Sequence, residues 1–305
     1  MMAMRSADQG RDIGAALDLF TSLMNHSCDP NAFVFCEGAQ LRARSSRPIA
    51  AGEEITINYV DPSYDYSFRQ KRLKPQYFFA CQCERCRIDV MGQGPVSVHL
   101  RSRSPDFEDV QGQLLEFHSN LVQSSHEPCT LEDLRDKEDQ MGLIGTAGFL
   151  NNGWPDYVQP GPEILQSFAL IYLLQDELER SLRLCLKLCF IIGESTYGTS
   201  SPQWVHILSV LVQVLAAMVH RPKANPPSGT LSKTKIPLPE IHGACLCQFA
   251  EAVKGMYGAD SAFARAADQL LEWEMNERRK LMSNDGFIAQ FRKEYSALFQ
   301  WADAQ

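Results

Sequence analysis

A cluster of closely spaced cysteines constrains this chain more than any other feature of its sequence. Cys81, Cys83 and Cys86 form a Cys-x-Cys-x2-Cys arrangement. A structural zinc ion takes four tetrahedral ligands, so this cluster is one ligand short. The leading candidate for the fourth is Cys28, far upstream in the chain. A shared ion would join two distant segments, whereas the alternative is four buried free thiols.

The remaining cysteines favour packing over chemistry. The chain has 10 cysteines and no apolar leader at its amino terminus, which is typical of a reducing compartment where disulfides are rare. A second metal site is one alternative for two pairs, Cys185 with Cys189 and Cys245 with Cys247. Packing in the core explains these cysteines without further assumption. The cysteines outside the predicted zinc site are Cys36, Cys129, Cys185, Cys189, Cys245 and Cys247.

Composition places the chain among globular proteins. Its 305 residues are 45% apolar and 22% charged, which is enough for two domains or one large one. The strongest apolar run, 207–219, is too short to cross a bilayer and includes a glutamine. We expect a protein of the nucleus and/or cytoplasm that does not contact membranes.

Charge is divided unevenly along the chain. Residues 1–90 carry 11 basic and 11 acidic side chains, so the whole net charge of −8 belongs to the remainder. An acidic surface does not attract nucleic-acid phosphates, which argues against direct nucleic-acid binding. It would attract basic substrates such as histone tails, although solvated helix faces are the simpler explanation.

Residues 1–90 show a pattern of short strands. Segments 32–35 and 40–44 flank a Glu-Gly-Ala turn, which predicts a β-hairpin. Segment 55–59 alternates apolar and polar side chains, as a half-buried strand does. A short helix over 66–78 leads into the cysteine cluster.

Beyond these residues the pattern is helical, with apolar side chains recurring three and four positions apart. We predict an α+β protein, in which a partial β-fold over 1–90 precedes an all-α domain. Helix pairs joined by short turns resemble a tetratricopeptide-like array, which either holds a partner or supports the first domain. The expected segments are a linker over 91–110, the helical domain over 111–305, helices at 202–219, 260–282 and 285–299, and a flexible loop at 221–239.

Three motifs in this order are typical of one family. They are Asn-His-Ser-Cys-Asp-Pro-Asn at 25–31, Gly-Glu-Glu-Ile-Thr-Ile-Asn-Tyr at 52–59 and the cysteine cluster at 81–86. Together they resemble the carboxy-terminal half of a SET domain with its post-SET zinc cluster. The cysteine in the first motif and the helical remainder are similar to the SET-and-MYND protein-lysine methyltransferases in particular.

The resemblance implies S-adenosylmethionine as cofactor, one structural Zn2+ and a protein substrate with a target lysine, histone or other. It implies that Tyr59 is catalytic and contacts the cofactor, and that Asn25, His26 and Phe79 also bind the cofactor. Plainer alternatives are a hydrogen-bonded strand tyrosine for Tyr59, a packed or turn-capping His26 and a core Phe79. The implied zinc ligands are Cys28, Cys81, Cys83 and Cys86.

Two parts of the family's architecture have no counterpart in this sequence: the first SET strands with their Gly-x-Gly turn, and the MYND zinc finger. We therefore expect this chain alone to bind S-adenosylmethionine weakly and to turn over little. The alternative function is a non-catalytic protein-interaction scaffold, in which a zinc-stapled SET remnant carries helical repeats.

Overall fold

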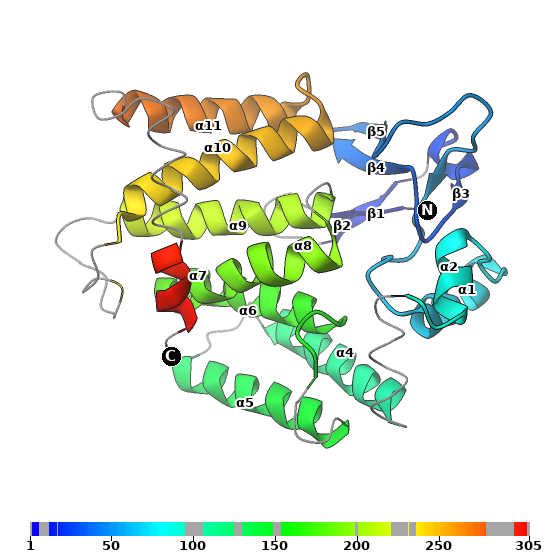
Figure 1. The fold of residues 1–305 in the computed structure, drawn as a ribbon, viewed down its shortest axis with the longest axis horizontal. Helices are drawn as coiled ribbons and strands as arrows, with labels where there is room; N and C mark the ends of the chain where they lie inside the picture. The colour runs from blue at the N-terminus through cyan, green and yellow to red at the C-terminus, as the bar shows by residue number, and fades with distance from the viewer. Residues whose placement is uncertain are drawn as a thin grey trace. The chain divides into compact units, whose positions relative to one another are not determined.

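The chain folds as two units, Met1–Arg103 and Ser104–Gln305. Short strands, two α-helices and one turn of 3-10 helix, η1 (Thr21–Leu23), make up the described part of the first unit, and helices make up that of the second (Figure 1). The predicted α+β class, a partial β-fold followed by a helical domain, is confirmed. The computed structural model describes residues 2–5, 12–16, 18–94, 106–124, 130–148, 154–198, 201–220, 231, 236–278 and 296–303.

Two antiparallel hairpins lie in the first unit. β4 (Ala32–Glu37) pairs with β5 (Gln40–Ser45), which confirms the predicted hairpin. Gly38 begins the two-residue turn at φ 60°, a left-handed conformation that glycine adopts without strain. The sequence did not predict the second hairpin, in which β1 (Met2–Arg5) pairs with β2 (Asp12–Ala16).

A short parallel pair joins the two segments that carry the first two motifs. β3 (Asn25–His26) lies beside β6 (Thr56–Ile57), so the strand predicted over 55–59 is shorter than expected. The buried Asn31 side chain forms hydrogen bonds with backbone groups that would otherwise pair between the strands of a longer sheet. Its Oδ1 accepts from the Thr56 N–H at 2.9 Å, and its Nδ2 donates to a carbonyl of the same segment at 2.8 Å.

Two helices flank the cysteine loop. α1 (Tyr66–Tyr77) begins at Asp65, whose side chain accepts from the Phe68 N–H at 3.0 Å, and it confirms the helix predicted over 66–78. Phe78 ends α1 in a left-handed conformation, φ 61°, and turns the chain toward the cysteines. α2 (Glu84–Val90) follows them.

The second unit is a stack of helices in which neighbours along the chain also pack together, as α9, α10 and α11 do in Figure 1. A segment of π-helix, η2, interrupts the α-helical geometry between α7 and α8. The elements are α4 (Phe107–Ser124), α5 (Leu131–Gly148), α6 (Gly161–Leu174), α7 (Leu178–Leu186), η2 (Lys187–Ile192), α8 (Gly193–Thr196), α9 (Pro202–Val219), α10 (Leu238–Tyr257) and α11 (Ala262–Arg278).

Some predicted segments fall partly outside the described residues. α9 matches the helix predicted over 202–219. α4 begins inside the predicted 91–110 linker, of which residues 95–105 are outside the described part. Most of the loop predicted at 221–239 is outside it as well, and α10 begins within that range. Of the helix predicted over 285–299, the described residues 296–299 are helical.

α9 is long and apolar enough, by length and composition, to cross a membrane. The apolar run predicted from the sequence, 207–219, is shorter because the helix begins at Pro202. More than half of α9 is buried, and it packs against α7 and α10. Its apolar surface therefore serves the core of the second unit.

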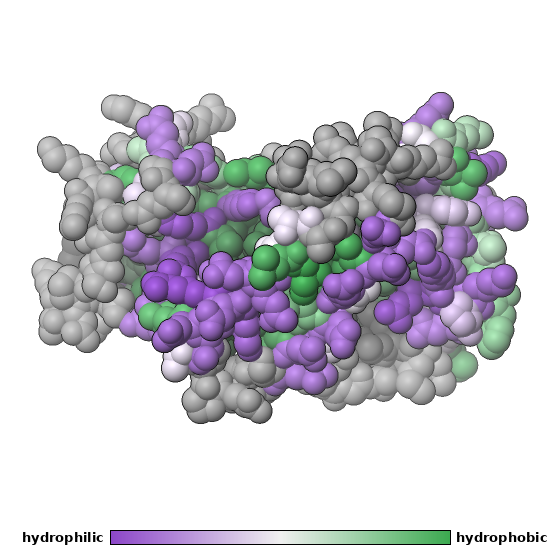
Figure 2. Space-filling model, turned by 90° about the horizontal axis from the view of Figure 1, so that it is seen from below, coloured by the Kyte–Doolittle hydropathy of each residue, from purple (hydrophilic) through white to green (hydrophobic). Residues whose placement is uncertain are grey.

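Among the residues coloured in Figure 2, hydrophilic side chains predominate, and hydrophobic side chains gather in smaller areas. The described core of the second unit lies instead among α6, α7, η2, α9 and α10, which contribute most of its fully buried apolar side chains.

Gly193 allows a close backbone approach where η2 meets α8. An ideal Cβ at this position would lie 2.5 Å from the carbonyl oxygen of Leu188 and 3.1 Å from the ring of Trp204. A methyl group therefore does not fit unless the backbone moves.

We expect Gly193→Ala to lower the free energy of unfolding by about 1–3 kcal/mol, because the π-helical turn must shift. Gly255→Ala is the matched control: Gly255 lies in α10 and its ideal Cβ meets nothing within 4 Å. That change should be neutral or stabilising by up to about 1 kcal/mol. Urea unfolding measures both, and equal losses would contradict the close approach.

Candidate metal centre and active site

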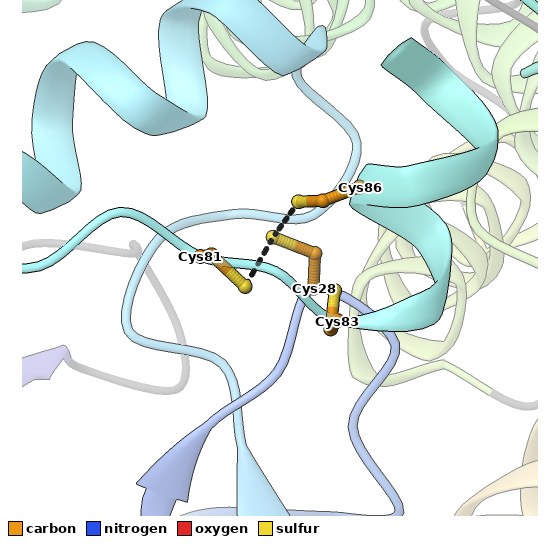
Figure 3. A group of neighbouring side chains, drawn as sticks. All are labelled: Cys28, Cys81, Cys83 and Cys86. Carbon is orange, nitrogen blue, oxygen red and sulfur yellow. Dashed lines mark hydrogen bonds between the residues drawn. The ribbon is translucent and has the colours of Figure 1, made fainter. Parts of the chain in front are cut away.

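Four cysteine sulfurs converge in the first unit. Cys28 comes from the loop after β3, Cys81 and Cys83 from the loop between α1 and α2, and Cys86 from α2 itself. All four sulfurs lie within 4.8 Å of one another. Figure 3 marks the contacts of the Cys28 sulfur with those of Cys81 and Cys86, at 4.0 and 3.5 Å. The structure thus brings together the four residues that the sequence assigned to one ion.

This spacing suits a tetrahedral metal site. With metal–sulfur bonds of about 2.3 Å, two sulfurs of a tetrahedral zinc site lie about 3.8 Å apart. The distances from Cys28 to Cys81 and Cys86, 4.0 and 3.5 Å, bracket that value. The donor set, four thiols whose sulfurs all lie within 4.8 Å of one another, therefore fits a structural zinc ion.

Thiolates rather than thiols bind metal, and the cluster favours a thiolate at Cys86. A hydrogen bond with Cys28 and the nearby Arg69 guanidinium lower the pKa of Cys86 to about 5. The shared proton correspondingly raises the pKa of Cys28. Burial raises the pKa of Cys81 to about 11.

A buried arginine supports the cluster, and sequence reasoning missed it. Arg69 of α1 is 1% exposed and donates from Nε to Cys28 Sγ at 3.1 Å. Its other arm forms an ion pair with Asp89 of α2 at 2.6 Å, and Asp89 is 6% exposed. The positive charge offsets the excess negative charge that four thiolates bring. One signal was available: Arg69 and Leu73 lie on one helical face at i and i+4, which the structure buries.

Gln70 holds the cysteine loop from the same helix. Its amide oxygen accepts from the Cys81 N–H and its Nε2 donates to the Cys81 carbonyl, both at 3.0 Å. The same Nε2 approaches Cys86 Sγ at 3.5 Å. These contacts orient the loop independently of any ion, as outer groups of a metal site do.

His26 connects the cysteine cluster to Tyr59. Its Nδ1 accepts from the Tyr59 N–H at 3.0 Å, and its Nε2 lies 3.2 Å from Cys28 Sγ. An accepting Nδ1 means that Nε2 carries the proton, so it donates to the sulfur. Burial and the charge of Arg69 lower the pKa of His26 to about 4, which keeps the ring neutral.

Aromatic rings surround His26. The ring of Tyr59 lies 5.3 Å and that of Phe79 5.9 Å from the His26 ring, measured between centroids. The Tyr59 hydroxyl donates to the Met24 carbonyl at 2.6 Å. Burial and the neighbouring Tyr77 raise the pKa of Tyr59, so its hydroxyl stays protonated. Tyr77, which no sequence motif indicated, has its ring centroid 4.7 Å from that of Tyr59.

An open pocket of about 480 Å3 lies beside this group. Of the four predicted cofactor residues, all of which the structure describes, His26 and Phe79 line it. The exposed Asn25 side chain instead donates to Glu54 at 2.6 Å. The roles predicted for Asn25, His26, Tyr59 and Phe79 stay predictions. The remaining lining residues are Ser27, Asp29, Asn31, Arg47, Glu53, Glu54, Thr56, Ala80, Cys81, Gln82 and Cys83.

The cysteines of the second unit behave as core side chains. Cys185, Cys189 and Cys245 are fully buried, and burial together with the other two thiols raises the pKa of Cys189. Among the residues that the structure describes, the groups with converging ligand atoms are the four-cysteine cluster and a histidine–glutamate group. Neither includes these thiols, so core packing accounts for them. Cys129 lies outside the described residues.

Comparisons with known proteins agree with this geometry. The SET domain family model matches residues 4–60. Histone-lysine N-methyltransferase SMYD3 of Mus musculus is 44% identical over 77 residues, which are 25% of this chain and 18% of that protein. SET domain and MYND-type zinc finger protein 6 of Schizosaccharomyces pombe is 42% identical over 77 residues, 25% of this chain and 16% of the relative.

A longer similarity extends beyond the cysteine loop. N-lysine methyltransferase SMYD2 of Homo sapiens is 31% identical over 111 residues, which are 36% of this chain and 25% of that protein. The chain thus spans about a quarter or less of the length of the curated relatives that it matches.

We expect Arg69→Met to lower the free energy of unfolding by about 3 kcal/mol, because the buried Asp89 loses the guanidinium at 2.6 Å while Arg85 stays 4.0 Å away. Arg72→Met is the control, because Arg72 is exposed on the same helix. This change should alter the free energy of unfolding by about 0.5 kcal/mol or less. Adding Asp89→Leu to Arg69→Met should recover part of the loss in chemical denaturation. No recovery in the double variant would contradict a role for the ion pair.

Proposed function

We propose that this chain, whose residues 4–60 match the SET domain family model, is part of an S-adenosylmethionine-dependent protein-lysine methyltransferase. Tyr59 is the proposed catalytic residue, and His26 and Phe79, with Asn25 at the edge, are the proposed cofactor contacts. Zinc on Cys28, Cys81, Cys83 and Cys86 is the proposed structural metal.

One observation carries the proposal: a hydrogen-bond chain that runs from the cysteine cluster to Tyr59. Cys28 Sγ accepts a hydrogen bond from the Nε2–H of His26, and His26 Nδ1 accepts a hydrogen bond from the Tyr59 N–H. A metal on Cys28 would therefore fix the ring that positions Tyr59. Through this link, a structural ion would help to orient the groups of the neighbouring active site.

The pocket suits the cofactor in size and charge. Its volume of about 480 Å3 falls in the range of about 300–1,000 Å3 that is usual for small-molecule sites. Phe79 and the neutral His26 offer flat surfaces for an adenine ring, and Asp29 with Glu54 supplies negative charge opposite a sulfonium or ammonium group.

The cofactor, when bound, supplies a methyl group activated on a sulfonium. Methyl transfer to an amine is an in-line displacement, so the chain's residues act by alignment and by excluding water. The Tyr59 hydroxyl is protonated and stabilises charge as an oriented dipole. A lysine must lose its proton before it attacks, and an apolar aromatic surround favours the neutral amine.

Protein lysines are the proposed substrate class, histone or other. The acidic balance of residues 91–305 would favour basic substrates. Nucleus and/or cytoplasm is the proposed location, and we propose neither direct nucleic-acid nor membrane binding.

The purified chain should retain about one tightly held zinc after dialysis against a chelator, since four thiolates form a closed site. Cys83→Ser removes one ligand and should lose most of this zinc. Cys36→Ser is the matched control, because Cys36 lies in β4 outside the cluster. Elemental analysis measures the zinc, and a zinc content unchanged by Cys83→Ser would refute the site.

The weak methyl transfer to core histones that we expect of this chain should fall by about 10²-fold or more in Tyr59→Phe, because an oriented hydroxyl is lost. S-adenosylmethionine affinity, measured by isothermal titration, should change little. Tyr64→Phe is the control, since Tyr64 stacks on Phe68 away from the pocket residues. Full activity in Tyr59→Phe would remove its catalytic assignment. Absence of S-adenosylmethionine binding even at millimolar concentration would favour the scaffold function instead.

A further inference from the structure

Three side chains with metal-binding atoms meet in the second unit. His220 caps the carboxyl end of α9, His242 lies in α10 and Glu274 lies in α11. Their ligand atoms all lie within 4.8 Å of one another. Because they come from three neighbouring helices (Figure 1), their convergence is a property of the helical stack and of no sequence motif.

Each oxygen of the Glu274 carboxylate faces one histidine. Oε2 lies 3.0 Å from His220 Nε2, and Oε1 lies 3.4 Å from His242 Nδ1. With metal–ligand bonds of about 2.0–2.1 Å, nitrogen and oxygen ligands of a tetrahedral zinc ion lie about 3.4 Å apart. The two distances therefore allow an ion to enter with small side-chain movements.

Burial also argues for an ion. Glu274 is 1% and His242 is 3% exposed, and a buried carboxylate needs compensating positive charge. His220 is 41% exposed, so it gives an ion a path from solvent and leaves room for water as a fourth ligand. Two histidines, one carboxylate and an open position form a common donor set for zinc and for other divalent transition metals.

We propose that His220, His242 and Glu274 form a divalent transition-metal site, suited to Zn2+, that ties together α9, α10 and α11. This inference does not rest on the proposed methyltransferase function, because all three ligands belong to the second unit. The site would be weaker than the four-cysteine cluster, because it has fewer protein ligands and no thiolates.

Trp273 provides a reporter for the proposed site. Its ring centroid lies 5.3 Å from that of His220. The test uses the full chain, with the cysteine cluster filled by Zn2+ and loosely held metal removed by a mild chelator. Titration with Co2+ should quench the Trp273 fluorescence in a saturable manner, with one further equivalent bound. Trp273→Phe should abolish that quenching and still bind the ion.

His220→Ala should weaken Co2+ binding by about tenfold or more, since one of three protein ligands is lost. Because His220 is half-exposed, this variant should fold. His206→Gln is the matched control: it removes another histidine of α9 and should bind as the unchanged chain does. Glu274→Gln preserves the shape of the side chain and should also lose binding.

Thermal unfolding gives a second readout, because an ion that binds only the folded state raises the melting temperature. Added Zn2+ should raise the melting temperature of the unchanged chain and of His206→Gln, and have little effect on His220→Ala. No saturable Co2+ binding, or equal binding by His220→Ala, would overturn the proposal and leave a hydrogen bond between His220 and Glu274 with His242 beside it. Methyl transfer enters neither readout, so failure here leaves the proposed function standing.

Discussion

The meeting of Cys28 with the cysteine loop is the contact on which the site of the first unit depends. Its partners Cys81 and Cys86 lie 53 and 58 residues further along the chain, and closing so long a loop carries an entropic penalty. Strong interactions at the point of contact must therefore offset this penalty. The four sulfurs lie within 4.8 Å of one another and could bind one metal ion, which would hold the two segments together. A structural zinc ion contributes directly to the free energy of folding.

The positive charge of Arg69 offsets the negative charge of the cysteine thiolates that converge here. Its guanidinium reaches Cys28 and is anchored by Asp89, so α1, α2 and the loop after β3 share one buried polar network. A network of this kind is stable only when every member is satisfied. His26 extends the network to Tyr59, which couples the geometry of the cluster to the predicted catalytic residue.

The second unit relies on a different principle. Its cohesion comes from apolar helix faces, with α9 buried against α7 and α10. Within that apolar surround, a buried carboxylate between two histidines is a feature that hydrophobic packing does not require. The contact with His220 at 3.0 Å offsets part of the cost of burying the Glu274 carboxylate, and the proposed ion would offset more of it.

The sequence by itself determined the elements whose signals are local. Asp65 and Ser201 cap α1 and α9, Gly38 sets the β4–β5 turn, and the cysteine spacing indicates a metal site, because each signal acts within a few residues. The tertiary structure alone decided the rest. A pattern within one segment cannot say which distant side chain will face it, and Arg69 with Asp89, and His220 with Glu274, became neighbours only when separate helices packed together.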